Sequence, residues 1–423
     1  MALAQSFIAV EPDSHFPLQN LPYGVFSSRD NAVRRIGVAL GNQVVDLCAL
    51  SNAGLLRGQR CQWHDCFRQA SLNSFMALGR PEWREARAVL MRLLDKNEGR
   101  LRDDTILRQR AIVPMEEVTM HLPAEVGDYT DFYASREHAT ACGEMFRGHE
   151  NALNPNWLSL PVAYHGRSSS VVVSGTPIRR PRGQVLGPGG PPASLQACSV
   201  LDYELEMGCL IGPGNELGEP VGVAEARDHM FGLVLLNDWS ARDVQRWEMV
   251  PLGPFASKNF ATSISPWVVT FEALEPFRCD APKQDPEVLP YLREAGRHSY
   301  DIQLEAAIEA QGGGGGTVTR SNFRHLYWTL EQMVAHHTAG GCNLRPGDLL
   351  GTGTLSSAAT GGAACLLEAS RNGANPVALA PGVERTFLCD GDAVCLSAHC
   401  QGNGFRVGFG ECVGRVMPAR AGQ

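Results

Sequence analysis

The chain has 423 residues, more than one compact core usually holds, so two or three domains are expected. Its 45 Asp and Glu outnumber 37 Lys and Arg, and no basic run is present, so nucleic acid is not an expected partner. Apolar residues make up 44% of the chain, which is enough for a large core, and the 45 Gly and 26 Pro favour a turn-rich β fold.

The sequence also bears on location. No stretch of 18 or more apolar residues is present, so no membrane span is expected, and the first residues have no basic or apolar signal segment. The 13 Cys are scattered, mostly in apolar surroundings such as those of Cys209 and Cys395, which indicates reduced thiols in the cytoplasm. Cys61, His64 and Cys66 lie close together, but a second ligand pair is missing, so a zinc site is not favoured there.

The first part of the chain predicts short strands followed by a helix. β-branched runs at 35–40 and 44–47 flank Gly41 and Asn42, which predicts a hairpin. Pro81 then suits the first turn of a helix whose apolar face includes Trp83, Leu90 and Leu93. The charged segment 95–109 predicts a surface helix or connector. We place a domain boundary near residue 120, which gives a small β-rich domain at 1–120 and a larger domain at 121–423.

The larger domain is predicted to be mostly strands. The apolar run 231–236 is typical of a strand buried on both faces, and the runs at 393–398 and 405–410 predict a hairpin around the Gly-Asn-Gly sequence at 402–404. The five glycines at 312–316 predict a flexible loop and not a phosphate-binding turn, because the flanking pattern of such a turn is missing.

Four carboxylates are candidates for a metal site. Glu204 and Glu206 are two residues apart in a predicted strand and so would leave the same face, Asp238 ends the buried run, and Asp131 precedes a predicted helix. Carboxylates alone suit a hard ion such as Ca²⁺ or Mg²⁺. The spacing is also compatible with a solvated strand face for Glu204 and Glu206 and with a helix cap for Asp131. It does not show that the four side chains converge.

A histidine and three donors are candidates for catalysis. His138 follows Asp131 by seven residues, nearly two helical turns, so in a helix both side chains would point the same way, and an imidazole beside a metal-held acid suits a general base. Arg242 and Gln245 share a face of a helix that we expect to be N-capped after Asp238, and Lys258 follows a Pro-Gly loop; together they could stabilise an oxyanion. The simpler alternatives are that His138 is a surface or core histidine and that Arg242 forms an ion pair with a neighbouring acid.

Several ordered blocks of sequence are then similar to one family. They are GDYTDFYASREHAT at 127–140, MFRG at 145–148, PVAYHGRSS at 161–169, LDYELEM at 201–207, LNDWSARDVQ at 236–245, VPLGPF at 250–255, NLRPGDLL at 343–350 and HCQGNGFRVGFG at 399–410. With the block FPLQNLPYGVF at 16–26, they make the chain resemble, over nearly its whole length, the fumarylacetoacetase family of fumarylacetoacetate hydrolases.

The resemblance implies a mainly β (α+β) fold, with a small N-terminal SH3-like β-barrel followed by a larger mixed β-roll catalytic domain, working as a homodimer. It implies metal-dependent hydrolysis of a carbon–carbon bond in 4-fumarylacetoacetate to fumarate and acetoacetate, the last step of tyrosine and phenylalanine catabolism. The implied cofactors are Ca²⁺, held by Asp131, Glu204, Glu206 and Asp238, and Mg²⁺, held around Asp238 and the segment from Lys258, through its carbonyl, to Thr262.

The resemblance also implies roles for single residues. His138, oriented by Glu368, would activate water, while Arg242, Gln245 and Lys258 would hold the oxyanion. The residues implied to contact the small diketo acid substrate are Tyr133, Arg147, Tyr164, Gln245 and Thr354.

Three positions depart from the family pattern. Met249 stands where a substrate-contacting Tyr is usual, and Ala261 replaces a usual Gly, which matters only if the backbone there has a positive φ. The loop 354–368 lacks its usual acidic and Pro residues. The alternatives are therefore another enzyme of the superfamily, an acylpyruvate hydrolase or an oxo-acid decarboxylase, and a binding protein without activity.

Overall fold

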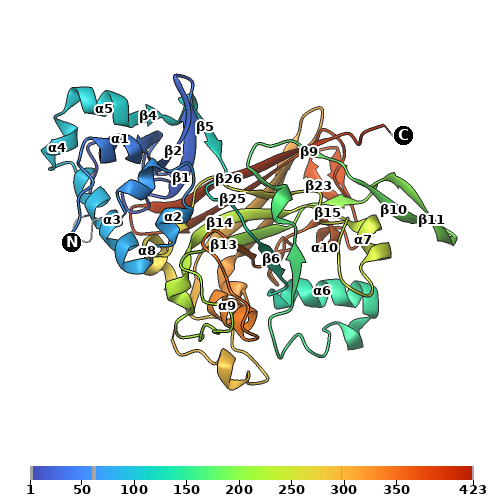
Figure 1. Cartoon of the computed structure of the whole chain (residues 1–423). Coiled ribbons are helices and arrows are strands. Elements are labelled where there is room, and N and C mark those ends of the chain that lie inside the picture. The colour runs from blue at the N-terminus through green and yellow to red at the C-terminus, as the bar shows by residue number, and fades with distance from the viewer. Residues whose placement is uncertain (1–2, 60–62, 297, 422–423) are drawn as a thin grey trace.

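The computed structural model describes residues 3–59, 63–296 and 298–421 (Figure 1). The protein is mainly β, as expected from its turn-rich composition, and its helices are short. No helix among these described residues is long and apolar enough to cross a membrane. Cys209 is buried and Cys395 is half-buried, whereas Cys61 of the disfavoured zinc cluster lies outside the described residues.

The first sheet has five strands in the order β4-β3-β2-β1-β5. Its strands are β1 (Tyr23–Ser28), β2 (Asn31–Leu40), β3 (Gln43–Asp46), β4 (Ile112–Pro114) and β5 (Val118–His121). Leu40 pairs with Gln43 across the predicted hairpin, and Gly41 has a φ of 60°, which a glycine adopts without strain. The predicted hairpin is confirmed.

Five short helices pack beside this sheet, at the left of Figure 1: α1 (Leu47–Asn52), α2 (Asn73–Met76), α3 (Arg80–Leu93), α4 (Gly99–Arg102) and α5 (Thr105–Ala111). Pro81 lies in the first turn of α3, and Trp83, Leu90 and Leu93 are buried on one face of this helix. The predicted helix is therefore confirmed, and the charged segment 95–109 contains α4 and most of α5.

Two larger sheets cross the middle of the molecule, where β13, β14, β25 and β26 run side by side in Figure 1. The first has the order β7-β6-β22-β13-β14-β16-β8, with β17 also pairing β14, and contains β6 (Tyr129–Phe132), β7 (Ala163–Gly166), β8 (Val171–Val173), β13 (Leu205–Ile211), β14 (Met230–Asp238), β16 (Thr262–Ile264), β17 (Val269–Thr270) and β22 (Leu349–Gly351). The second has the order β21-β20-β25-β26-β9 and contains β9 (Ile178–Arg179), β20 (Gln303–Glu309), β21 (Gly315–Asn322), β25 (Ala393–Gln401) and β26 (Arg406–Met417).

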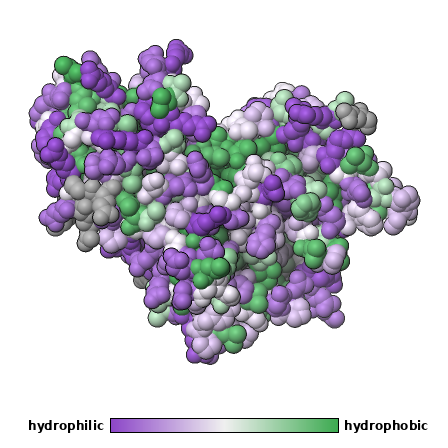
Figure 2. All heavy atoms as spheres, viewed as in Figure 1, coloured by the Kyte–Doolittle hydropathy of each residue, from purple (hydrophilic) through white to green (hydrophobic). Residues whose placement is uncertain are grey.

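Smaller elements complete the fold. The two-stranded pairs are β10 (Arg182–Gly187) with β11 (Gly190–Ala197), β12 (Leu201–Asp202) with β15 (Ser240–Ala241), β18 (Arg278–Cys279) with β19 (Ser299–Tyr300), and β23 (Val377–Ala380) with β24 (Val383–Arg385). The remaining helices are α6 (Arg136–Arg147), α7 (Arg242–Glu248), α8 (Phe271–Leu274), α9 (Leu330–Thr338) and α10 (Leu366–Ala369). In Figures 1 and 2, the β10–β11 hairpin projects from the right of the molecule.

Strand β14 is buried on both faces, as its continuous apolar run predicts. Leu233 and Leu235 belong to the core between the two larger sheets, whereas Phe231 and Leu236 belong to a core shared with the N-terminal helices. The ring of Phe231 packs edge-on against Trp83 of α3, with 5.1 Å between ring centroids. This burial fixes the strand that ends at Asp238.

The two predicted glycine turns have different outcomes. β25 and β26 form the predicted antiparallel hairpin around residues 402–404. The flexible loop predicted at 312–316 is wrong in part, because Gly315 and Gly316 belong to β21 and pair with Glu309 and Ile308. A Cβ on Gly316 would lie 2.4 Å from the Leu379 carbonyl oxygen, so a close backbone approach explains why glycine is present there.

Candidate active site

Three of the four nominated carboxylates meet at the ends of neighbouring strands. Asp131 lies in β6, Glu206 in β13 and Asp238 at the end of β14, and one oxygen from each lies within 4.8 Å of the others. Gly351 of β22 lies opposite Asp131, and a Cβ there would approach Asp131 Oδ1 to 2.5 Å. The three carboxylates, which we call the acidic cluster, are buried, so the solvated strand face is wrong for Glu206.

Few hydrogen-bond donors serve the acidic cluster. The Gly353 N–H donates to Asp131 Oδ1 and to Glu206 Oε2, both at 3.1 Å, and the Tyr164 hydroxyl donates to Asp238 Oδ2 at 2.8 Å. Within the described residues, Glu206 Oε1 is buried without a hydrogen-bond partner. Burial, followed by repulsion from neighbouring carboxylates, raises the pKa of Asp131 and of Glu206 well above the usual range.

The acidic cluster fits a divalent ion. Its donors are all carboxylate oxygens, which hard ions prefer, and Glu206 Oε1 is an unused ligand atom. Burial and mutual repulsion disfavour the ionised forms of these carboxylates, and a bound cation would stabilise those ionised forms.

Glu204 has a different environment from Glu206. The predicted continuous strand is wrong, because residues 203 and 204 lie in a break between β12 and β13. The buried Glu204 accepts hydrogen bonds from Arg242 Nη2 at 2.9 Å and from Lys258 Nζ. Burial alone would raise the pKa of Glu204, but Lys258 and Arg242 outweigh it and the pKa falls. Glu204 is therefore an ionised carboxylate beside the acidic cluster.

Lys258 joins Glu204 to the acidic cluster. Its Nζ donates to Glu204 Oε2 and to Asp238 Oδ2, and Thr262 Oγ1 lies 3.4 Å from Asp238 Oδ1. Burial alone would lower the pKa of Lys258. The charges of Asp238 and Glu204 raise the pKa by more than burial lowers it, so the net shift is upward. The ammonium group is therefore charged and lies at the edge of the site.

His138 and Glu368 form a buried pair. His138 Nδ1 lies 2.5 Å from Glu368 Oε1, and its Nε2 lies 3.9 Å from Glu204 Oε1. The side chain of Ser356 donates to Glu368 Oε1 at 2.7 Å. Burial lowers the pKa of His138, but Cys142 and Glu368 more than offset it, and the net shift is upward. The carboxylate thus fixes one ring nitrogen and leaves the other directed toward Glu204.

The helical argument that placed His138 near Asp131 is wrong. Asp131 lies in β6, and α6 begins at Arg136 with Ser135 as its N-cap, whose side chain accepts from the His138 N–H at 3.3 Å. A helix-capping role for Asp131 is therefore also excluded. The two residues share the site because α6 begins near the end of β6, not because they share a helix face.

Arg242 forms ion pairs with Asp202 and Glu204, so the simpler interpretation of this residue, an ion pair with a neighbouring acid, is confirmed. Its Nε and Nη2 donate to Asp202 Oδ2 at 3.0 and 2.9 Å, and its Nη2 also reaches Glu204. Its Nη1 lies 3.2 Å from Gln245 Oε1, as the shared helix face predicts. The predicted side-chain cap of α7 is wrong: Ala241 is the N-cap, and Ser240 Oγ donates to the Asp238 carbonyl instead.

Sequence reasoning missed Asp202. Besides Arg242, this buried carboxylate accepts the N–H groups of Leu366 and Leu367, at 2.7 and 2.9 Å, at the start of α10, the helix that carries Glu368. Asp202 was visible in the LDYELEM block, but no local pattern distinguishes it from a surface strand residue. Asp202 therefore connects Arg242 with α10, the helix that carries Glu368, the hydrogen-bond partner of His138.

The nominated substrate residues divide into two groups. Tyr133 packs edge-on against His138 with 5.3 Å between centroids, Tyr164 bonds to Asp238, and Thr354 is buried with its hydroxyl unpartnered among the described residues. Arg147 is exposed at the end of α6, where it donates to the carbonyls of Asn151 and Ala152 at 3.0 and 2.7 Å. Its bonds are to that loop and not to the acidic cluster.

The departures from the family pattern leave the site geometry intact. Ala261 is buried and is not among the described residues with a positive φ, so a glycine is not needed there. Met249 follows α7 and is 42% exposed, in a loop where Val250 and Leu252 are more exposed still. The loop 354–368 brings Ser356 to Glu368 despite its altered composition.

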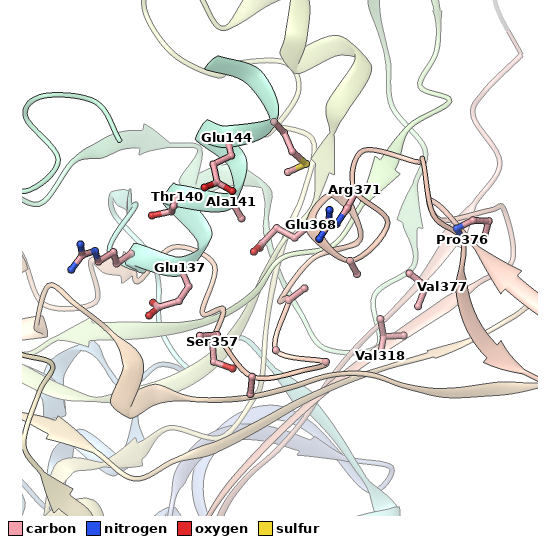
Figure 3. Close-up of a pocket in the computed structure, with 18 residues that line it drawn as sticks. Glu137, Thr140, Ala141, Glu144, Val318, Ser357, Glu368, Arg371, Pro376 and Val377 are labelled. Atoms are coloured by element: carbon pink, nitrogen blue, oxygen red, sulfur yellow. The ribbon is translucent and has the colours of Figure 1, made fainter. Parts of the chain in front are cut away.

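A cavity of about 930 Å³ lies beside the His138–Glu368 pair. Figure 3 shows Glu137, Thr140 and Glu144 of α6 on one side, with Glu368 and Arg371 opposite. The residues of the acidic cluster are not part of its lining. The cavity therefore reaches Glu368 but not the acidic cluster.

Comparisons with known proteins indicate the family of the chain. The family described as fumarylacetoacetate (FAA) hydrolase C-terminal matches residues 128–417, and the family described as fumarylacetoacetase N-terminal matches residues 19–123. The chain is 55% identical to the fumarylacetoacetase of Arabidopsis thaliana over 99% of this chain and 100% of that protein. It is 53% identical to the fumarylacetoacetase of Homo sapiens over 98% of this chain and 99% of that protein.

A solved structure, the fumarylacetoacetate hydrolase from psychrophilic Exiguobacterium antarcticum, has a similar fold, with a TM-score of 0.54 and 17% identity over 95% of this chain and 100% of that chain. Both family matches and the near full-length identities lead to one conclusion: the chain belongs to the fumarylacetoacetate hydrolase family.

Proposed function

We propose that the protein hydrolyses the carbon–carbon bond of 4-fumarylacetoacetate to give fumarate and acetoacetate, the final step of tyrosine and phenylalanine breakdown. The observation that carries this proposal is the His138–Glu368 pair, whose free ring nitrogen lies 3.9 Å from Glu204 beside the acidic cluster. Support also comes from relatives with this activity in their names, at 53% to 55% identity over nearly the whole chain.

His138 acts as the general base. Glu368 accepts the Nδ1–H, and in the neutral ring Nε2, which lies 3.7 Å from Cys142 Sγ and 3.9 Å from Glu204 Oε1, takes a proton from water. The resulting hydroxide oxygen bonds to the carbonyl carbon on the fumaryl side of the diketone. The carbon–carbon bond then breaks, its electron pair stays with the acetoacetate carbon, and that carbon takes up the proton that His138 Nε2 had removed from water, which returns the base to its neutral form. Ser356 and Asp202 hold Glu368 and its helix in place.

Lys258 and Arg242 supply positive charge next to this water. Both are buried and both bind Glu204, so their charges are fixed before substrate arrives. Together with Gln245 they stabilise the oxyanion of the tetrahedral intermediate; one fixed donor typically contributes about 3 kcal/mol. Tyr133, Tyr164 and Thr354 contact the diketone, and Arg147 binds a substrate carboxylate after leaving its loop carbonyls.

Asp131, Glu206 and Asp238, together with Glu204, hold the divalent ion, which we propose to be Ca²⁺. A second ion, Mg²⁺, is proposed near Asp238 and Thr262, with Lys258 contributing its carbonyl oxygen. When bound, a divalent ion supplies a Lewis acid that stabilises negative charge on diketone oxygens. The absence of nitrogen or sulfur ligands from the acidic cluster supports a hard ion.

The remaining features of the proposal concern organisation. The protein is proposed to be a cytoplasmic homodimer in which residues 1–120 form an SH3-like barrel and residues 121–423 form the catalytic β-roll. The break between the two family matches, at residues 123 and 128, supports a division close to this position.

The test is a spectrophotometric assay of the purified protein with fumarylacetoacetate, with and without a chelator. Loss of the diketone absorbance that stops with the chelator and returns with Ca²⁺ or Mg²⁺ is the expected result. Acylpyruvates form the second arm, because Met249 replaces a usual substrate-contacting Tyr. Turnover of acylpyruvates alone would replace the proposed substrate, and no turnover of either would indicate a binding protein.

A further inference from the structure

Three titratable side chains that the proposed reaction does not use meet where Glu294 and His298 lie against Glu331 at the start of α9. His298 Nδ1 lies 3.5 Å from Glu294 Oε1 and 3.8 Å from Glu331 Oε1. One ligand atom from each of the three lies within 4.8 Å of the others. This group, which we call the second cluster, has no residue in common with the active site.

The His298 ring is oriented as in a metal-bound histidine. Its Nε2 lies 2.9 Å from the Ala295 carbonyl oxygen, which can only accept, so Nε2 carries a hydrogen. Nδ1 therefore faces the two carboxylates. Histidine ligands of metals usually donate their other N–H to a carbonyl or carboxylate in this way. In addition, Thr329 Oγ1 donates to Glu294 Oε1 at 2.6 Å and fixes that carboxylate.

Glu331 lies in the second cluster with an unused oxygen. Its side chain is only 3% exposed, and Oε2 has no hydrogen-bond partner within the described part of the chain. His298 Nδ1 likewise has no hydrogen bond there. In the described part of the chain, the ion pairs of Glu294 and Glu331 are formed with His298, and no Lys or Arg there lies within ion-pair distance of either acid. Buried charges usually bind a cation or another charged group.

The separations suit a small transition-metal ion. Ligands about 2.0–2.1 Å from a tetrahedral Zn²⁺ lie about 3.3 Å apart, close to the 3.5 and 3.8 Å between His298 Nδ1 and the carboxylate oxygens. One imidazole and two carboxylates suit Zn²⁺ better than Ca²⁺ or Mg²⁺, because those harder ions prefer oxygen ligands alone.

We propose that Glu294, His298 and Glu331 bind one Zn²⁺ or similar transition-metal ion, which ties Glu294 and His298 to α9. The ion joins two segments of the chain, and none of its three ligands belongs to the catalytic pair. In the metal-free protein the Glu331 carboxylate raises the pKa of His298 to about 9, so the ring holds a proton that the ion displaces.

The test is calorimetric titration of the full chain with Zn²⁺ in excess Ca²⁺ and Mg²⁺, which together keep both proposed ion sites of the active site occupied. The wild type is compared with His298→Gln, Glu331→Gln and, as the matched control, His149→Gln, whose side chain is 91% exposed. We expect one Zn²⁺ site, whose affinity falls by more than about 100-fold in the two cluster variants. This loss is larger than is usual when a residue that only orients a metal ligand is replaced. The control should bind as wild type does, and Mg²⁺-supported turnover should be unchanged.

Co²⁺ in place of Zn²⁺ identifies the ligands. A visible spectrum of tetrahedral Co²⁺ without a thiolate charge-transfer band, lost in His298→Gln, is expected. Equal Zn²⁺ binding by the wild type and both cluster variants, no Zn²⁺ binding at all, or a thiolate band would each overturn the proposal. If Glu331→Gln does not fold, His298→Gln still decides, because His298 is the more exposed of the two, with 17% of its side chain exposed against 3% for Glu331.

Discussion

Glu204 and Glu206 are two residues apart in the chain, yet they belong to opposite halves of the active site. Glu206 lies with Asp131 and Asp238, where burial and like charges raise its pKa. Glu204 lies against Lys258 and Arg242, whose charges outweigh burial and lower its pKa. The first half needs a cation from solution, whereas the second half has cations of its own. Both glutamates are proposed ligands of the divalent ion, but only Glu204 also fixes the positions of two protein cations.

The largest expected effect comes from His138, which lies next to the second half. His138→Ala removes the proposed base but no ligand of the acidic cluster, so turnover should fall by about 10²–10⁴-fold while divalent-ion affinity stays unchanged. Steady-state kinetics and calorimetry measure the two quantities, and His149→Ala, at an exposed histidine just beyond α6, is the control. Turnover near the wild-type rate would remove His138 from the mechanism.

Matched substitutions of the two glutamates compare the halves directly. Glu204→Gln leaves Arg242 and Lys258 buried with less countercharge, so the free energy of unfolding of the metal-free protein should fall by about 3 kcal/mol. Glu206→Gln removes a repelling charge, so the metal-free protein should lose no stability although its ion affinity falls. Denaturant unfolding with a chelator measures both variants; equal losses would mean that the halves do not differ.

The pH dependence of stability separates the halves without mutation. Because the pKa values of Asp131 and Glu206 are raised in the folded protein, their contribution to metal-free stability is present below the ordinary carboxyl range and is lost as pH rises through the raised values. A divalent ion competes with those protons and restores stability. The difference in Tm between ion-saturated and chelated protein should therefore widen from pH 5 toward pH 8, on the order of several degrees; a constant difference would contradict the assignment of these carboxylates.

The smallest expected effect is at Ser356, which bonds to Glu368 but touches no reacting atom. Ser356→Ala should lower kcat by about fivefold with little change in KM, since one hydrogen bond of about 1 kcal/mol is lost. If Ser356 acts by positioning Glu368, the acidic limb of the plot of kcat against pH should move in Ser356→Ala. In Ser356→Thr, which keeps the hydroxyl, that limb should return to its wild-type position. A change in KM alone would assign Ser356 to substrate binding.

Much of the local structure could be predicted from the sequence. The Gly41 hairpin, the helix from Arg80 and the doubly buried strand β14 follow from turn chemistry and apolar periodicity, which act over a few residues. The predicted continuous strand through Glu204 and the common helix of Asp131 and His138 are wrong, because the strand breaks at residue 204 and α6 starts only at Arg136. Both errors concern the places where a strand ends at the site.

The sequence by itself determined which residue types stand at these strand ends, and its ordered blocks of similarity determined the family. Only the tertiary structure decided that Glu204 binds cations while Glu206 lacks them, that Asp202 connects Arg242 to α10, and that Glu294, His298 and Glu331 meet. These outcomes depend on contacts between residues far apart in the chain. Burial and neighbouring charge, which set the pKa of a carboxylate, come from such contacts and leave no pattern in the nearby sequence.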